Sequence, residues 1–344
     1  MILVLNCGSQ SIKWKVFDNK LKQVAANKRD VLDSEKFDDI LTDELLQIGQ
    51  EINLIGHRVV HGGKNFIEPL VITKENLQEL EKINHLAPLH NPYNILGIKA
   101  CEKIFQNVKQ VAVFDTEFFS QLPEVAKIYA LPEKIAKEYG FYRYGFHGIS
   151  NEYIYRKVAE KFKKSFNKLK IIVCHLGGGA SISAINNGKA IDTSMGFTPT
   201  EGLVMMTRAG NIDSGIVLQL VKEFGVEGAD KILNKESGIK GICGQEDMLK
   251  VLEGVKNDKK TKLAFDIFCY SVKKYIGAYF AILGGCDVLI FTGSIGAGYP
   301  KTRKTICKDL EILKKTKILA IQTNEELAIA QKILKLNNSY KNGK

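Results

Sequence analysis

A passage that occurs twice constrains the fold of this chain more than any other feature. The first copy covers residues 1–17 and the second covers residues 171–185. Each reads as a strand, a small polar turn and a second strand, with the turns at residues 7–11 and 177–181. Two copies suggest duplicated domains, although two unrelated glycine hairpins remain an alternative at this point.

The turns of both copies are rich in glycine and serine. Such turns present backbone N–H groups and hydroxyls that could hold a polyphosphate, and glycine permits close approach of the backbone. In the first copy, Ile12, Trp14 and Val16 alternate with lysines, which predicts a half-buried strand. In the second, Asn187 and Gly188 predict a tight hairpin turn.

Further apolar runs and helical patterns alternate along the chain. The expected strands include residues 51–55, 111–114 and 287–291, and the expected helices include residues 76–83, 150–162 and 262–283. Strands mixed with helices indicate an α/β architecture. A last helix is expected over residues 324–336, with Thr323 as its N-cap.

Composition limits the class of protein. The chain has 344 residues, of which 45% are hydrophobic and 25% charged, so it is long enough for two folded domains. No apolar run is long enough to span a bilayer, and the N-terminus reads as a first strand and not as a signal peptide. Seven cysteines without a CxxC pair indicate reduced thiols in a cytoplasmic protein.

The formal net charge of +11 raises the question of nucleic-acid binding. The lysines, however, are spread through segments such as residues 250–262 and are not interleaved with aromatic residues. A solvated lysine surface is therefore the expectation, with no nucleic-acid partner and no membrane partner.

Two candidate residues lie near expected strands. Arg58 stands in the glycine-flanked segment 56–63, although by itself it would more often be a structural arginine. The neighbouring His57 and His61 are not part of an HExxH motif, because the glutamate that a zinc-binding helix needs is absent. Asp115 ends an apolar strand, a frequent active-site position, with a helix cap as the alternative.

Two further candidates lie in loops. His147 stands between two glycines and is open to a ligand, with a buried, hydrogen-bonded histidine as the alternative. Arg208 belongs to a long polar stretch over residues 192–210, and such stretches inside a folded chain are usually functional.

Two arginines, a histidine, an aspartate and two glycine-serine turns suit phosphoryl transfer, which depends on positioning and on charge stabilisation. Neither a P-loop nor a protein-kinase signature occurs. A carboxylate acceptor is already anionic at neutral pH, so it needs cations and no general base, and arginine suits both groups.

At these residues the sequence closely resembles the acetate kinase family. The matching blocks are residues 6–17, 56–63, 85–91, 114–116, 144–150, 175–181, 192–210 and 323–327. The resemblance implies duplicated ribonuclease-H-like (actin-like ATPase) α/β domains with an active-site cleft between them. It implies a first domain over residues 1–118, joined by a C-terminal helix over 325–344, and a second domain over 119–324. The chain looks like a shortened member, mainly between Asp18 and Glu51 and between Pro300 and Gln322.

The resemblance also implies roles by position. Arg58, Asp115, His147 and Arg208 would be catalytic, with Arg58 also binding substrate. Asn6 and Glu325 would associate with the metal. The pocket for the acyl group would consist of Val60, Leu89, Phe146 and Pro199. The nucleotide would contact Lys13, His175, Leu176, Gly177, Gly178, Gly179, Asp247, Met248, Leu249, Ser294, Ile295, Gly296, Ala297 and Gly298.

Departures from the family pattern gather on the nucleotide side. Gly178 replaces an asparagine, Ala297 and Gly298 replace a glutamate and an asparagine, and Leu249 replaces an arginine. The expected activity is reversible transfer between ATP and acetate, giving ADP and acetyl phosphate with Mg²⁺ (or Mn²⁺), in a cytoplasmic homodimer. The alternatives are a propionate or butyrate kinase, a pyrophosphate-type donor, and a non-catalytic nucleotide-binding relative.

Overall fold

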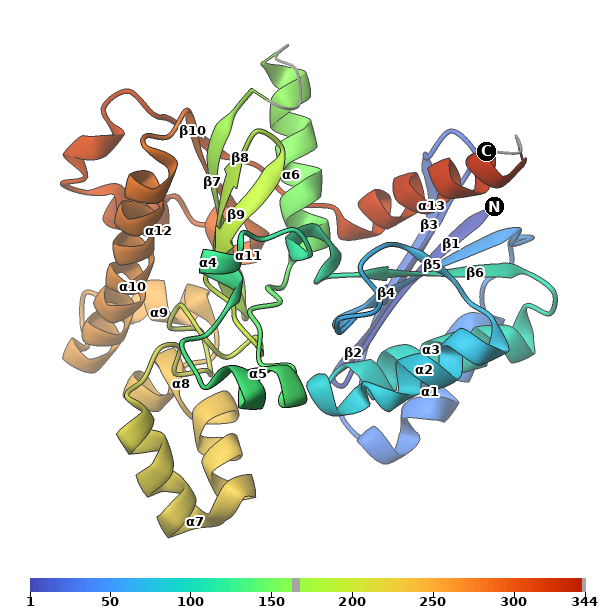
Figure 1. Ribbon diagram of the computed structural model, residues 1–344, viewed down its shortest axis with the longest axis horizontal. Helices are drawn as coiled ribbons and strands as arrows, with labels where there is room; N and C mark the ends of the chain where they lie inside the picture. Colours follow the sequence, from blue (N-terminus) through green and yellow to red (C-terminus); the bar gives the residue numbers. More distant parts are fainter. Residues whose placement is uncertain (163–167, 342–344) are drawn as a thin grey trace. The chain divides into compact units, whose positions relative to one another are not determined.

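A computed structural model describes residues 1–162 and 168–341, and it divides the chain into two compact units (Figure 1). Unit 1 comprises Met1–Ser120, Gly148–Tyr153 and the C-terminal residues from Asn324; unit 2 comprises Gln121–His147 and Ile154–Thr323. The short segment Gly148–Tyr153 thus groups with unit 1, whereas the expected boundary assigned it to the second domain. Residues 342–344 of the expected C-terminal helix lie outside the described residues.

Unit 1 contains a six-stranded sheet in the order β3-β2-β1-β4-β6-β5. Its strands are β1 (Ile2–Gly8), β2 (Ser11–Phe17), β3 (Gln23–Asp30), β4 (Leu54–Val59), β5 (Leu70–Val71) and β6 (Lys109–Phe114). The first three strands form an antiparallel meander, and β4 and β6 extend it in parallel from β1. Strand β5 pairs antiparallel with β6 at the edge.

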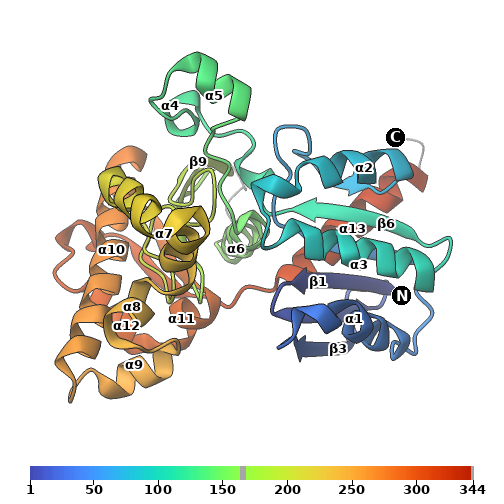
Figure 2. The same cartoon turned by 90° about the horizontal axis from the view of Figure 1, so that it is seen from below.

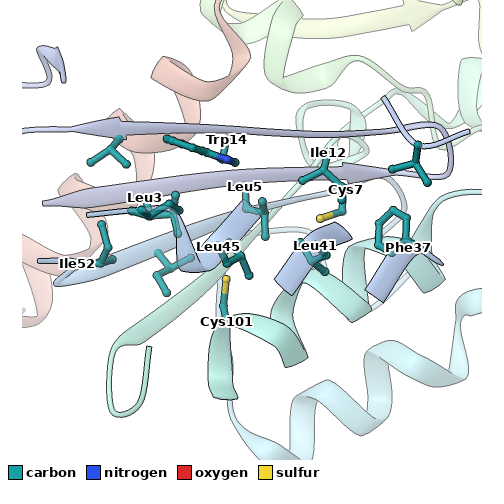
Figure 3. Close-up of a cluster of buried hydrophobic side chains, with 14 residues drawn as sticks. Leu3, Leu5, Cys7, Ile12, Trp14, Phe37, Leu41, Leu45, Ile52 and Cys101 are labelled. Carbon is teal, nitrogen blue, oxygen red and sulfur yellow. The ribbon is translucent and has the colours of Figure 1, made fainter. Parts of the chain in front are cut away.

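Helices cover both faces of this sheet. They are α1 (Phe37–Leu46), α2 (Lys74–Lys82), α3 (Asn91–Ile104) and α13 (Glu325–Lys341), with the short turns η1 (Ser34–Lys36), η2 (Asn84–Leu86) and η3 (Glu117–Phe119). Because side chains alternate along a strand, β1 serves two cores. Leu3 and Leu5 pack with Leu41 of α1 (Figure 3), whereas Val4 packs with Ile329 of α13. The predicted alternation of β2 is confirmed, since Ile12, Trp14 and Val16 are all buried.

Unit 2 contains a five-stranded sheet in the order β11-β10-β7-β8-β9. Its strands are β7 (Lys170–Leu176), β8 (Ala180–Asn186), β9 (Lys189–Thr193), β10 (Val288–Thr292) and β11 (Lys317–Ala320). Here too an antiparallel meander, β7 to β9, is extended in parallel by β10 and β11. The two sheets therefore share one topology, which confirms the duplication predicted from the repeated passage.

The helices of unit 2 are gathered mostly between β9 and β11. They are α4 (Glu124–Lys127), α5 (Glu133–Tyr139), α6 (Gly148–Lys161, which begins in unit 1), α7 (Ser214–Lys235), α8 (Gly238–Cys243), α9 (Met248–Gly254), α10 (Lys259–Leu283), α11 (Gly293–Gly298) and α12 (Pro300–Cys307), with η4 (Glu311–Leu313). The long helix α10 packs on β7 and β8 and also contacts α8, α9 and α12 (Figure 2).

Local signals match the structure with one correction. Asn187 and Gly188 both have positive φ, as a type I′ hairpin turn requires, so the predicted hairpin is confirmed. Helix α13, however, is capped by Asn324, whose side chain accepts from the N–H of Leu327 at 3.2 Å, and not by Thr323. Asn324 is the N-cap because it directly precedes the first helical residue, Glu325.

All seven cysteines are free thiols. Within residues 1–162 and 168–341, no helix has both the length and the apolar character needed to cross a membrane.

Candidate active site

Four polar residues of unit 1 meet where β1, β4 and β6 end and α13 begins. We call Asn6, Arg58, Asp115 and Glu325 the arginine–carboxylate cluster. Arg58 donates from Nη2 to Oδ2 of Asp115 at 2.6 Å and from Nη1 to Oδ1 of Asn6 at 3.3 Å. Its Nε lies 3.7 Å from Oε2 of Glu325. The parallel strands β1, β4 and β6 bring these side chains to one edge of the sheet, because their carboxyl ends lie together.

Burial shapes the electrostatics of this cluster. The side chain of Asp115 is only 1% exposed, and its Oδ1 atom has no hydrogen-bond partner. Burial raises the pKa of Asp115 to about 6, and the Arg58 guanidinium opposes that shift. Asp115 and Glu325 in turn raise the pKa of Arg58 despite its burial. The cluster therefore holds a fixed cation beside an aspartate that can still change its charge.

The same cluster offers oxygen ligands. Asn6, Asp115 and Glu325 supply amide and carboxylate oxygens, and one oxygen of the buried Asp115 is unpaired. In the described part of the chain, no group of three or more His, Cys, Asp or Glu residues is arranged to hold a metal ion. Mg²⁺ is usually held by one or two carboxylates together with substrate phosphates, so this donor set fits Mg²⁺ bound with its substrate.

Two asparagines of α3 fix the segment that follows β4. The side chain of Asn94 accepts from the N–H of Val60 at 3.0 Å, and Asn91 accepts from the N–H of His61 at 3.1 Å. Both asparagines are buried. A buried asparagine gives no periodic signal, so the sequence pattern did not predict these two hydrogen bonds. They hold Val60 in place, whereas Leu89, just before α3, is 39% exposed.

Lysines of β2 border the cluster. In the β1–β2 pairing, Lys13 lies opposite Asn6. Lys15, two residues further along β2, forms an ion pair with Glu326 at 2.9 Å and donates to the Asn324 side chain at 3.1 Å. It thus fixes the first turn of α13, which carries Glu325. Sequence reasoning missed Lys15, which looked like an ordinary solvent-facing lysine.

In unit 2, the predicted glycine turn joins β7 to β8. The N–H of Gly177 donates to the carbonyl oxygen of Gly179 at 3.0 Å, which closes the turn. Helix α11 packs beside it, and a Cβ on Gly177 would lie 3.5 Å from the Ser294 hydroxyl. Gly293 has φ of +77°, and a Cβ there would come within 2.5 Å of the Leu176 carbonyl oxygen. Only glycine permits that approach.

His147 lies beside the same turn. It has a left-handed backbone with φ of 61°, which is rare for a non-glycine residue and is found at functional sites. Its ring stacks on His175, with centroids 4.1 Å apart, and its Nδ1 lies 3.0 Å from the Ser181 hydroxyl. A Cβ on Gly179 would lie 3.7 Å from the ring. The neighbouring Phe146 is buried.

Arg208 also reaches the glycine turn. A Cβ on Gly179 would lie 3.7 Å from its Nη1. That Nη1 donates to the carbonyl oxygen of Pro199 at 3.1 Å. Burial lowers the pKa of Arg208, and across the described residues no carboxylate forms an ion pair with it. A half-buried guanidinium without a carboxylate partner suits an anionic ligand.

The remaining candidates are more scattered. Residues 294–298 form α11 beside the glycine turn. Asp247 caps α9 by accepting from the N–H of Leu249 at 2.8 Å. Met248 is buried and Leu249 is half exposed. Contacts described for Asp247 keep to its own helix, so a nucleotide role for residues 247–249 stays a prediction.

Two sheets of one topology, with a glycine turn beside the half-buried His147 and Arg208 in one unit and an arginine–carboxylate cluster in the other, indicate a phosphotransferase of the actin-like ATPase fold. Residues 23–316 match the model of the acetokinase family. The chain belongs to that family and is a kinase.

Individual relatives agree with this assignment. An acetate kinase from Carboxydothermus hydrogenoformans is 41% identical over 392 residues, covering 97% of this chain and 98% of the relative. The crystal structure of the Porphyromonas gingivalis acetate kinase has a TM-score of 0.88 and 34% identity, covering 98% of this chain and 99% of that chain. A propionate kinase from Francisella tularensis has a TM-score of 0.88 and 36% identity, covering 96% and 98%.

Proposed function

We propose that this protein transfers a phosphoryl group reversibly between ATP and acetate, giving ADP and acetyl phosphate. The observation that carries the proposal is the environment of Arg208. A half-buried guanidinium that lacks a carboxylate partner among the described residues, and whose pKa its partial burial lowers, is stabilised when an anion binds it. A transferring phosphoryl group is such an anion, and the adjacent His147 adds a hydrogen-bonding group.

The proposed step balances without a proton transfer. A carboxylate oxygen of acetate attacks the terminal phosphorus of ATP, and the bond from that phosphorus to the bridging oxygen breaks, so ADP leaves with the electron pair. Since the acceptor is already an anion, no base is needed. The arginines are needed instead, because they lower the repulsion between two anions and stabilise charge on the phosphoryl oxygens.

Asp115 then has an orienting role. Its two hydrogen bonds from the Arg58 guanidinium, at 2.6 and 3.1 Å, fix the plane of that group, which leaves Nη1 directed at Asn6. Asn6 and Glu325 would hold Mg²⁺, with Mn²⁺ as an alternative, and the ion would supply charge neutralisation for the phosphate oxygens.

Propionate is the second candidate acceptor. The similarity to a propionate kinase, at 36% identity, is comparable to that with an acetate kinase structure, at 34%. The acyl pocket proposed for Val60, Leu89, Phe146 and Pro199 would discriminate the two acids only weakly, because one methylene changes binding by about 1–3 kcal/mol.

The donor is proposed to be ATP, with another nucleotide or a pyrophosphate-type donor as the alternative. The family pattern has larger polar side chains at three positions that are Gly178, Ala297 and Gly298 here. The pattern is kept at the proposed catalytic positions, Arg58, Asp115, His147 and Arg208. A donor that has phosphates but no nucleobase, such as pyrophosphate, would need only these four catalytic residues.

We also propose a homodimer located in the cytoplasm. Helix α7 supports the first, because Ile216, Leu218, Phe224 and Val226 are all at least half exposed, and a run of exposed apolar residues marks an interaction surface. Seven free cysteines support the second, since thiols persist in a reducing compartment.

One assay tests the activity. Wild-type protein and Arg208→Ala are incubated with Mg²⁺, ATP and acetate, propionate or butyrate, and acyl phosphate is trapped with hydroxylamine. We expect turnover by the wild type and a loss of ~10²-fold or more in the variant. A parallel panel replaces ATP by GTP or pyrophosphate. No acyl phosphate with any pair of substrates would refute the proposal and leave a binding-only relative.

A further inference from the structure

The side chain of Arg143 holds the loop that follows β9. The loop, residues 194–202, carries Pro199 and has neither helix nor strand. Arg143 donates from Nη1 to the carbonyl oxygens of Thr193 and Ser194, at 3.2 and 3.4 Å, and from Nη2 to Oε1 of Glu201 at 2.6 Å. One guanidinium therefore binds both ends of the loop. It is also tied to α4, because its Nε donates to the Ala126 carbonyl oxygen at 3.1 Å.

Tyr129 completes this anchor. Its hydroxyl donates to Oε2 of Glu201 and accepts from the N–H of Phe197 at 2.9 Å, in the middle of the loop. Arg143 lies over the Tyr129 ring, 5.4 Å from its centroid. Gly196 is enclosed so tightly that a Cβ would lie 1.7 Å from Oε2 of Glu201 and 2.0 Å from the Tyr129 hydroxyl. The loop is thus held by Arg143 and Tyr129, which lie outside it, through its own Glu201.

The loop in turn determines the hydrogen bond of Arg208. The Pro199 carbonyl oxygen, two residues before Glu201, accepts from Nη1 of Arg208 at 3.1 Å. The other polar atom described beside that guanidinium is the weakly accepting sulfur of Met205, at 3.9 Å. Because no carboxylate of the described residues pairs with Arg208, the loop carbonyl is what fixes its direction.

We propose that Arg143 and Glu201 are positioning residues, which hold the loop 194–202 and, through the Pro199 carbonyl, direct the Arg208 guanidinium at the transferring phosphoryl group. This inference rests on the proposed function, in which Arg208 stabilises the transition state. Neither residue touches the reacting atoms in this scheme. A displacement of about 1 Å in a group that positions the reaction can cost ~10²-fold in rate, so the effect should be large.

The decisive experiment is a double-mutant cycle with Arg143→Ala, Arg208→Ala and the double variant, in the hydroxamate assay. If Arg143 acts through Arg208, the double variant should be about as slow as Arg208→Ala alone. We expect Arg143→Ala to lower kcat by ~10- to 10²-fold while the KM for the phosphoryl donor changes less than about twofold. Losses that multiply in the double variant would overturn the inference.

Conservative variants separate positioning from simple loss of stability. Arg143→Lys keeps a charge opposite Glu201, but an ammonium has three N–H donors for the four oxygens that Arg143 binds, so we expect it to restore only part of kcat. Glu201→Gln keeps the acceptor for Arg143 and should fall between the wild type and Arg143→Ala. Arg29→Ala, at an exposed arginine of β3 in unit 1, is the matched control and should leave kcat unchanged.

Hydrogen exchange tests the inference without any activity. Amides of residues 194–202 should exchange at least ~10-fold faster in Arg143→Ala than in the wild type, while amides of β7 and β10 exchange as before. Unchanged loop exchange would overturn the inference whatever reaction the protein catalyses. A wild type that makes no acyl phosphate but shows the exchange effect would refute the proposed function alone and keep the anchor.

Discussion

The half-buried Arg58 and the buried Asp115 form an ion pair in which one carboxylate oxygen, Oδ2, accepts from both Nε and Nη2 of the guanidinium, at 3.1 and 2.6 Å. The other oxygen, Oδ1, is buried without a hydrogen-bond partner. Only one of the two carboxylate oxygens of Asp115 therefore accepts hydrogen bonds. It also explains how an aspartate beside an arginine can have a raised pKa, because burial outweighs the neighbouring charge.

The first prediction concerns pH. Asp115 has a pKa of about 6 in the folded protein, raised from 3.8, so it loses its charge as the pH falls through 6. Its hold on Arg58 then weakens, and kcat/KM for acetate should decline on the acid side with an apparent pKa of about 6. We expect Asp115→Asn to have low activity without this limb. An unchanged limb in the variant would assign it to a substrate proton instead.

The same shift has a consequence for stability with the opposite sign. Because the folded pKa is higher than the unfolded one, the contribution of Asp115 to stability is complete below about 4 and is lost as the pH rises through about 6. Denaturant titrations should therefore show a flatter pH dependence of the unfolding free energy in Asp115→Asn than in the wild type over this window.

The second prediction concerns Lys15 and the metal. Lys15 is an anchor for the first turn of α13, through Glu326 at 2.9 Å and Asn324 at 3.1 Å. In Lys15→Met, Glu325 should be held less firmly, and the Mg²⁺ concentration for half-maximal rate should rise by roughly 3- to 5-fold, in line with an ion pair of up to ~1 kcal/mol. Lys28→Met breaks an exposed pair with Asp30 and is the control. An equal Mg²⁺ requirement in both variants would contradict this role.

The third prediction compares two glycines. A Cβ on Gly148 would lie 2.2 Å from the carbonyl oxygen of Asp115, so Gly148→Ala must displace backbone next to the cluster. We expect it to destabilise the protein by about 1–3 kcal/mol and to lower kcat. Gly277, inside α10, has open space around an added Cβ, so Gly277→Ala should stabilise by up to ~1 kcal/mol. Thermal unfolding should move the two melting temperatures in opposite directions.

The fourth prediction concerns the donor. An added Cβ would meet nothing within 4 Å at Gly178 or at Gly298, so both positions have space for the first atom of an asparagine side chain. If amides here bind the nucleotide, Gly178→Asn and Gly298→Asn should each lower the KM for ATP by roughly 2- to 10-fold, as one hydrogen bond would. The KM for acetate should stay constant. A panel with pyrophosphate is the control, because its KM should not fall.

The fifth prediction concerns the acid. Val60 is buried after β4 and is held through its N–H by Asn94. Val60→Ala removes two methyl groups from the proposed acyl pocket and should raise kcat/KM for propionate relative to acetate by about 10-fold or more. Competition between the two acids in one assay measures this ratio directly. A ratio equal to that of the wild type would exclude Val60 from the pocket.

Periodicity and turn chemistry in the sequence determined much of the fold. The alternation of Ile12, Trp14 and Val16 fixed the buried face of β2, and Asn187-Gly188 fixed a hairpin, because both are local steric effects. Strand β3 (Gln23–Asp30) was not predicted. It is largely exposed and has no apolar alternation, so only its pairing with β2 makes it a strand.

The candidate site likewise contains residues that the sequence pattern predicted and residues that it did not. Arg58, Asp115, His147 and Arg208 could be named from the sequence, because glycine neighbours, a strand end and a long polar loop mark them. The residues that support them could not be named from the sequence. Asn94 acts on Val60, Lys15 on Glu326 and Arg143 on Ser194, at sequence separations of 34, 311 and 51. Glu201 acts on Arg143, at a sequence separation of 58. The residue types of the chain determined the chemistry available. Only the tertiary structure decided which of them are held in place, because burial, ion pairing and hydrogen bonding depend on neighbours that sequence distance does not reveal.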